Sequence, residues 1–208
     1  MIYIRSLLFS FTWYKNLIVD YWSTDITIAT AFAALCMTRE RFRAILSFFH
    51  INDNDTFIAR GLPNHDPLHK IHPLYDHLRQ AFASVSTPKQ NICIDEALCP
   101  WRGRSQMRVY MKDKPVKWGI KLYELCESGS RYVWDFEIMA HEPGLSNAPF
   151  DICQRLIHPL KNVGFTLFID NFYCNPALCD ALAADNTMVV GTVRANRIGL
   201  PKTLFSSP

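Results

Sequence analysis

The sequence predicts a mixed α/β fold that is preceded by helices. Apolar runs rich in β-branched and aromatic residues recur in the second half of the chain, where they alternate with segments of helical periodicity. We therefore expect a helical part over residues 1–88 and a mixed sheet with flanking helices over residues 89–208. The chain has 208 residues, of which 49% are hydrophobic and 20% are charged, so it can bury a sizeable core.

Two amphipathic helices are predicted in the helical part. The apolar side chains after Thr38 recur every three or four residues to about Phe49, which predicts a helix. The hydroxyl of Thr38 is suited to cap its start. A second helix is predicted from Pro67 to about Val85. Pro73 lies inside it and is expected to split or kink it.

The sheet is predicted to contain five strands and two further helices. Glu127-Ser-Gly-Ser130 separates two strand patterns and so predicts a hairpin. Asn175 and Pro176 suit an N-cap and a first-turn proline. The expected strands lie at about Asn91–Pro100, Trp118–Cys126, Tyr132–Met139, Gly164–Ile169 and Met188–Val193, and the expected helices at Pro149–Leu160 and Pro176–Asp185.

Two of these strands lead directly into an aspartate. Asp95 follows Ile92-Cys-Ile94, and Asp170 ends the run that begins at Gly164. If the two carboxylates lie about 4 Å apart, they repel by roughly 4 kcal/mol at an effective dielectric constant near 20. A divalent cation would remove this repulsion, so the pair predicts a metal site, with solvated strand ends as the alternative.

Basic residues gather in two clusters, although the net charge is only +3. Between Arg102 and Lys121 there are seven Lys or Arg residues and one acid, and between Arg194 and Lys202 there are three basic residues and no acid. Such clusters indicate a polyanionic partner such as DNA, with a solvated surface as the alternative. The candidate DNA-binding residues are Arg102, Arg104, Lys112, Lys114, Lys117, Lys121, Arg194, Arg197 and Lys202.

The seven cysteines do not predict a zinc site. Their number is odd and none are spaced as CxxC, so we expect reduced thiols and a nuclear or cytosolic protein. Residues 1–19 are apolar, but basic residues interrupt them, so neither a signal peptide nor a membrane span is expected. We interpret them as the start of a fragment or of an alternative exon.

Four segments resemble, in order, the conserved blocks of the piggyBac transposase family. Ile94-Asp-Glu-Ala-Leu-Cys-Pro-Trp-Arg-Gly-Arg104 is similar to its first catalytic block, and Asp170-Asn-Phe-Tyr173 to its second. Lys114–Lys121 is similar to its KPxKWGxK segment, and Gly191–Lys202 to its GTxRxNRxGxP segment.

The resemblance implies a ribonuclease-H-like core of the DDE transposase class. Such a core cuts and joins double-stranded DNA with acidic residues and two Mg²⁺ ions, through hairpin ends at TTAA sites. Asp95 and Asp170 match the first two catalytic, metal-binding aspartates, and the first and fourth long strands are expected to be neighbours. A nuclear location, transposon ends as the DNA partner and a homodimer follow from the same resemblance.

The family's third catalytic acid lies beyond the segment that Gly191–Lys202 matches, so we expect an incomplete core with little or no activity. Glu96 and Asp180 are not assumed to replace it. An active transposase whose sequence is truncated here, and a domesticated DNA- or protein-binding module, are the alternatives. We also expect the incomplete sheet to leave Phe165, Leu167 and Val189 poorly covered.

Overall fold

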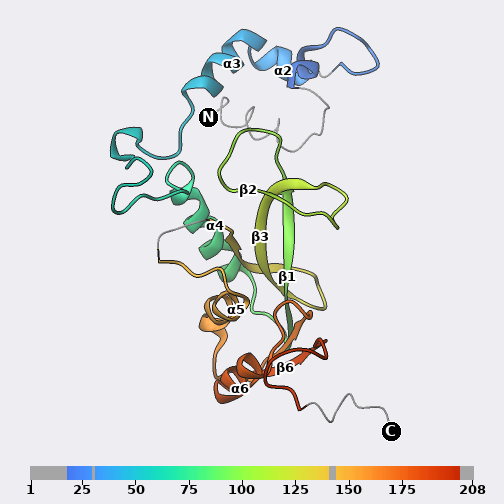
Figure 1. Ribbon diagram of the computed structural model, residues 1–208. Helices are drawn as coiled ribbons and strands as arrows, with labels where there is room; N and C mark the ends of the chain where they lie inside the picture. Colours follow the sequence, from blue (N-terminus) through green and yellow to red (C-terminus); the bar gives the residue numbers. More distant parts are fainter. Residues whose placement is uncertain (1–17, 30, 141–143, 202–208) are drawn as a thin grey trace. The chain divides into compact units, whose positions relative to one another are not determined.

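The computed structural model describes residues 18–29, 31–140 and 144–201 (Figure 1). The chain forms two compact units, which divide between Ile51 and Asn52. The division into a helical part to residue 88 and a core from residue 89 stays a prediction about domains. The expectations for residues 1–17 and for Lys202 fall outside the described residues.

The first unit contains a 3-10 helix, η1 (Ile18–Trp22), and the helices α2 (Ala31–Cys36) and α3 (Arg39–Phe48). The predicted cap of α3 is confirmed, since the hydroxyl of Thr38 accepts a hydrogen bond from the backbone N–H of Arg41. Trp22 packs on Phe42 with ring centroids 5.1 Å apart, and its indole N–H donates to the Met37 carbonyl.

The second unit begins with η2 (Asn54–Thr56) and α4 (His72–Val85). The predicted start of α4 at Pro67 was wrong, because the helix begins at His72 and Pro73 lies in its first turn. A proline has no N–H to donate, and its ring clashes with the preceding turn, so the first turn is where a helix tolerates it best. Pro73 therefore starts this helix and does not kink it.

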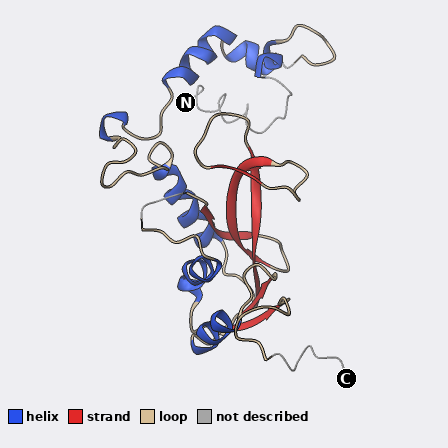
Figure 2. Ribbon diagram, viewed as in Figure 1, coloured by secondary structure: helices blue, strands red, loops and turns tan. Residues whose placement is uncertain are grey.

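A six-stranded mixed sheet forms the centre of the second unit (Figure 2). Its strands are β1 (Asn91–Pro100), β2 (Arg108–Tyr110), β3 (Trp118–Glu127), β4 (Val133–Ile138), β5 (Thr166–Ile169) and β6 (Met188–Gly191). The order is β2-β3-β1-β5-β6, and β4 also pairs with β3. β3 runs antiparallel to β1, whereas β5 runs parallel to β1 and β6 parallel to β5.

This topology confirms the predicted mixed α/β class and the predicted adjacency of β1 and β5. β2 was not predicted, because its three residues are too few to show an alternating pattern. α5 (Pro149–Ile157) is shorter than predicted: at His158–Leu160 the chain continues as the 3-10 helix η3, which contains Pro159. α6 (Pro176–Ala184) and its Asn175 cap agree with the sequence.

One face of the sheet packs against α5 and α6. Alternate residues of β1 and β5 point into this core, where they meet the apolar sides of the two helices. The core includes Ile92, Ile94, Leu125, Ile152, Leu156, Leu167, Ile169, Leu178 and Leu182. The residues between them on the strands, such as Cys93, Asp95 and Phe168, therefore belong to the opposite face of the sheet.

The apolar surface of the sheet is not the one that we expected. Phe165 is 5% exposed and Leu167 is fully buried, and Val189 packs against the same core. The exposed apolar residues are instead Phe168, Met188 and Val190, which lie on alternate positions of β5 and β6. The prediction named the wrong face, because strand alternation gives the two faces but not which of them the helices cover.

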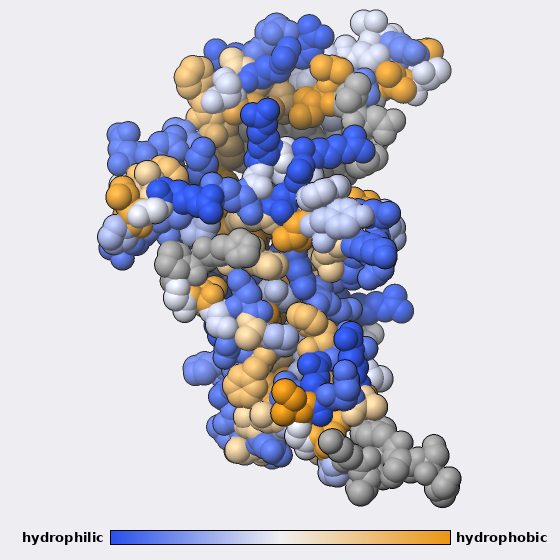
Figure 3. All heavy atoms as spheres, in the orientation of Figure 1, coloured by the Kyte–Doolittle hydropathy of each residue, from blue (hydrophilic) through white to orange (hydrophobic). Residues whose placement is uncertain are grey.

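The surface drawn in Figure 3 is mixed, with orange apolar residues lying among blue polar ones. None of the described helices is both long enough and apolar enough to cross a bilayer.

Candidate active site at the ends of two parallel strands

The register of β1 and β5 brings the two predicted aspartates to the end of the parallel ladder that these strands share, in the middle of β1 and directly after β5. Ile94 pairs with Ile169 at the last step of this parallel ladder, and Asp95 and Asp170 are the next residues on each strand. Neighbouring strands lie about 4.8 Å apart, so the two aspartates leave the ladder side by side. Both residues are exposed. Their assignment as catalytic residues stays a prediction.

A third acid, Glu124, faces Asp95 across the sheet and was not predicted as a site residue. It is the antiparallel partner of Asp95 on β3, so both side chains lie on the sheet face opposite the core. Partial burial and the nearby Asp95 charge raise the pKa of Glu124. An acid between the apolar residues of a strand was the available sequence signal, but only the β1–β3 register shows which residue it faces.

The loop after Asp170 is fixed by local hydrogen bonds. The Asp170 carboxylate accepts from the backbone N–H of Phe172 at 2.8 Å, and its carbonyl accepts from the N–H of Cys174 at 3.1 Å. The Asn175 side chain then accepts from the N–H of Leu178 at 3.0 Å and caps α6. The chain therefore passes from strand to turn to helix within a few residues, and these hydrogen bonds fix the position of Asp170 directly after β5.

Two of the predicted DNA-binding arginines hold this loop. Arg194 donates from Nε to the Asn171 side chain at 2.9 Å. Arg197 donates from one terminal nitrogen to the carbonyls of Asn171 and Phe172. Gly191 allows the end of β6 to lie close to the end of β5, because a Cβ atom there would lie 2.5 Å from the Ile169 carbonyl oxygen. Both arginines thus stabilise the Asp170 loop.

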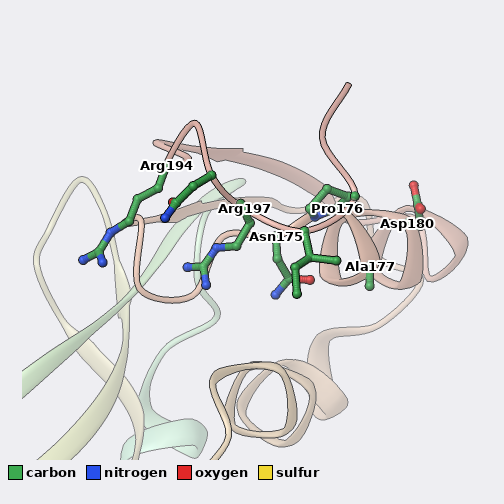
Figure 4. Close-up of a pocket in the computed structure, with 9 residues that line it drawn as sticks. Asn175, Pro176, Ala177, Asp180, Arg194 and Arg197 are labelled. Atoms are coloured by element: carbon green, nitrogen blue, oxygen red, sulfur yellow. The ribbon is translucent and has the colours of Figure 1, made fainter. Parts of the chain in front are cut away.

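Arg194 and Arg197 also line a pocket of about 750 Å³ at the N-terminus of α6 (Figure 4). Figure 4 shows Arg197 next to Asn175, with Asp180 at the other end of the pocket. The positive end of a helix dipole and the positive charges of arginines both attract anions. The pocket therefore suits a phosphate group on its arginine side.

Lys121, also predicted to bind DNA, is largely buried beneath the site. Its ammonium lies 3.1 Å from the Glu96 carboxylate, and the two side chains are only 12% and 13% exposed. The same ammonium lies 5.0 Å from the Phe172 ring centroid and 4.8 Å from that of Tyr123. Lys114 donates to the Glu96 carbonyl at 3.0 Å. These contacts tie β1, β3 and the Asp170 loop together.

The other described candidates for DNA binding are exposed. Arg102 and Arg104 follow β1, and Lys112 and Lys117 lie in the loop between β2 and β3. Their charges are available to a polyanion. Within residues 18–29, 31–140 and 144–201, no group of three or more His, Cys, Asp or Glu side chains is arranged to hold a metal ion.

Comparisons with known proteins place the chain in a family. The family model described as Transposase IS4 matches residues 4–207. Human piggyBac transposable element-derived protein 3 is 22% identical over 188 residues, which are 86% of this chain and 30% of the relative. Human piggyBac transposable element-derived protein 2 is 24% identical over 185 residues, which are 85% of this chain and 30% of the relative. The chain thus spans about a third of these relatives.

A solved structure shares the fold. The piggyBac transposase in a synaptic complex with hairpin DNA superposes with a TM-score of 0.83 at 24% identity, covering 99% of this chain and 44% of that one. The family match spans nearly the whole chain, and the chain therefore belongs to this transposase family, in the piggyBac group that its four sequence blocks predicted.

Proposed function

We propose that this chain is a piggyBac transposable element-derived protein that binds double-stranded DNA and has little or no cleavage activity of its own. The observation that carries the proposal is the parallel pairing of Ile94 with Ile169, which is followed on both strands by an aspartate. Two acids that leave a parallel ladder side by side, in a chain with exposed basic clusters, suit a phosphodiester substrate and a divalent cation.

We propose Mg²⁺ as the cation, with Asp95 and Asp170 as the residues that would hold it. The fit rests on the two aspartates that follow the paired residues Ile94 and Ile169, because the described residues include no group of three such side chains arranged to hold a metal ion. Bound cations would activate the attacking oxygen and stabilise the leaving one. Two matched aspartates leave each of two cations short of oxygen ligands, and we therefore expect weak metal retention and little turnover.

DNA would be held through its phosphates. The exposed residues Arg102, Arg104, Lys112 and Lys117, which lie beyond the C-terminal end of β1 and between β2 and β3, supply positive charge, and the arginine side of the α6 pocket is a second phosphate position. From the family resemblance we also propose transposon ends with TTAA sites as the DNA, a homodimer as the binding form and the nucleus as the location.

Binding is tested by fluorescence anisotropy with a labelled duplex over a range of salt concentrations. We expect the logarithm of the association constant to fall linearly with the logarithm of salt, by about 0.9 for each phosphate neutralised. The Arg102→Ala/Arg104→Ala chain should lose affinity and show a shallower slope. Arg60→Ala, an exposed arginine outside both basic clusters, is the matched control and should bind as the wild type does. Affinity that does not change with salt would contradict the proposal.

Cleavage is tested by incubating the purified chain with Mg²⁺ or Mn²⁺ and duplex DNA that carries candidate ends, beside an Asp95→Ala control. We expect no nicking by either protein. Nicking by the wild type that the Asp95→Ala chain lacks would show that the site is active, and Glu124→Gln would then test whether Glu124 is the additional ligand.

A further inference from the structure

Two cysteines lie directly opposite one another in the sheet. Cys93 on β1 is the antiparallel partner of Cys126 on β3, so both side chains project from the same face of the sheet. Both are free and half-buried. On this basis we propose that Cys93 and Cys126 are a site of oxidative modification. A disulfide bond forms between them, across the two strands, by exchange with a small-molecule disulfide.

The backbone already has the geometry that this bond requires. The N–H of Ser128 donates to the Asn91 carbonyl at 2.9 Å, so the β1–β3 register continues beyond Ile92 and Glu127. Hydrogen bonding alternates along an antiparallel ladder, so the Cys93–Cys126 position is a hydrogen-bonded one with Cα atoms about 5.5 Å apart. Disulfides span Cα separations of about 4.4–6.8 Å, so the Cα spacing suits the bond, and the Cβ atoms need only a small approach to reach the required separation of about 3.5–4.5 Å.

The remaining cysteines are less suited. Cys153 is fully buried and Cys174 is 7% exposed, so a reagent reaches them poorly. Cys174 precedes the α6 cap and Cys179 lies in the first turns of α6, but Cys174 is buried. Cys99 is exposed, but its cross-strand partner is Ile120. Cys93 and Cys126 combine access with a facing partner.

The exchange proceeds in two steps that balance. The first thiol attacks one sulfur of oxidised glutathione, breaks its S–S bond and releases one glutathione thiol. The second thiol then attacks the protein sulfur of this mixed disulfide and releases the other glutathione. In sum, the protein gives up two protons and two electrons, and one oxidised glutathione becomes two reduced ones. Excess thiol reverses the reaction.

The proposed disulfide does not depend on the proposed function. Its position next to the candidate active site nevertheless has a consequence for that site. Asp95 and Glu124 are the pair two residues further along the same face. A covalent link between Cys93 and Cys126 would therefore fix β1 to β3 next to Asp95 and Glu124.

The test uses the full chain in oxidised glutathione, followed by blocking of free thiols and non-reducing peptide mapping by mass spectrometry. We expect a peptide that joins Cys93 to Cys126, the loss of two hydrogen atoms from the protein mass, and reversal by dithiothreitol. The Cys99→Ser chain should form the same link. Cys93→Ser and Cys126→Ser should instead retain glutathione on the remaining thiol.

Three results would overturn the proposal. They are a wild-type chain whose Cys93 and Cys126 remain fully blockable while Cys99 is oxidised, a link between Cys174 and Cys179 in place of the expected one, and a link that forms only after urea is added. Since mapping of the wild type decides each of these, the proposal stays testable even where a serine variant fails to fold.

Discussion

Replacing Lys121 by Met should destabilise the second unit strongly, although the new side chain has a similar length. The change removes the positive charge that meets Glu96 at 3.1 Å. Glu96 would keep its charge in a position where its side chain is only 13% exposed. At an effective dielectric constant near 20, two unit charges at this separation attract by about 5 kcal/mol, before the cost of removing them from water.

Breaking a buried pair by removing one partner costs about 3–5 kcal/mol, because the other charge stays buried without compensation. We expect a loss of this size for Lys121→Met. The double variant Lys121→Met/Glu96→Leu should regain most of it, since an apolar pair of similar volume needs no charge compensation. Lys117→Met is the matched control: this lysine is exposed, so its loss should stay within about 0.5 kcal/mol.

The assay is urea unfolding of five proteins, namely the wild type, Lys121→Met, Glu96→Leu, the double variant and Lys117→Met, followed by both tryptophan fluorescence and circular dichroism to check that the transition is two-state. The reasoning would be refuted if Lys121→Met cost less than about 1 kcal/mol, or if the double variant lost the sum of the two single changes. Either outcome would mean that Lys121 is not an ion-pair partner of Glu96 in solution.

Three further predictions concern other contacts of the second unit. Arg79→Ala should cost about 3–5 kcal/mol in urea unfolding, because it removes two hydrogen bonds of 2.7 Å from an Asp135 side chain that is 8% exposed; full additivity with Asp135→Ala would contradict this. Glu124→Gln should raise the melting temperature at neutral pH, measured without divalent cations. Burial and Asp95 raise the folded-state pKa of Glu124, so the wild type loses stability as the pH rises from the unfolded pKa of about 4.3 through the folded one. If the melting temperature of Glu124→Gln still exceeded that of the wild type at a pH below the unfolded pKa, the charge of Glu124 would not be the cause. Asn175→Ala should lose about 0.5–2 kcal/mol with the α6 cap, whereas Asn175→Asp should keep most of it, and equal losses would show that the cap is not responsible.

The sequence predicted the long elements well and their environments poorly. Continuous apolar runs located β1 and β3 almost to the residue, and a hydroxyl or amide before a periodic segment located the starts of α3 and α6. These signals are local, since periodicity and capping depend on residues only a few positions apart.

The features that sequence could not supply depend on strand register. Glu124 lies beside Asp95 only because the two residues pair across β1 and β3. Lys121 is the ion-pair partner of Glu96 only because it lies on the core side of the sheet with Tyr123. A basic cluster in the sequence does not distinguish such a lysine from an exposed one such as Lys117. The start of α4 was misplaced for a different reason. A proline such as Pro73 is favourable in the first turn of a helix but breaks or kinks the interior of one, and the sequence alone did not show which position it holds.

The parallel ladder of β1 and β5 has a consequence for the order of folding. Residues 128–132 join β3 to β4, and residues 101–117, which include β2, join β1 to β3, so the pairing of these strands closes comparatively small loops. Ile94 and Ile169 are about 75 residues apart, and their pairing closes a far larger loop at a higher entropic cost. The two aspartates therefore meet only after the antiparallel strands provide a surface on which β5 can dock. In a nascent or partly unfolded chain, β1 would present an unpaired edge, with Asp95 beside Glu124 but without Asp170, until that step is complete.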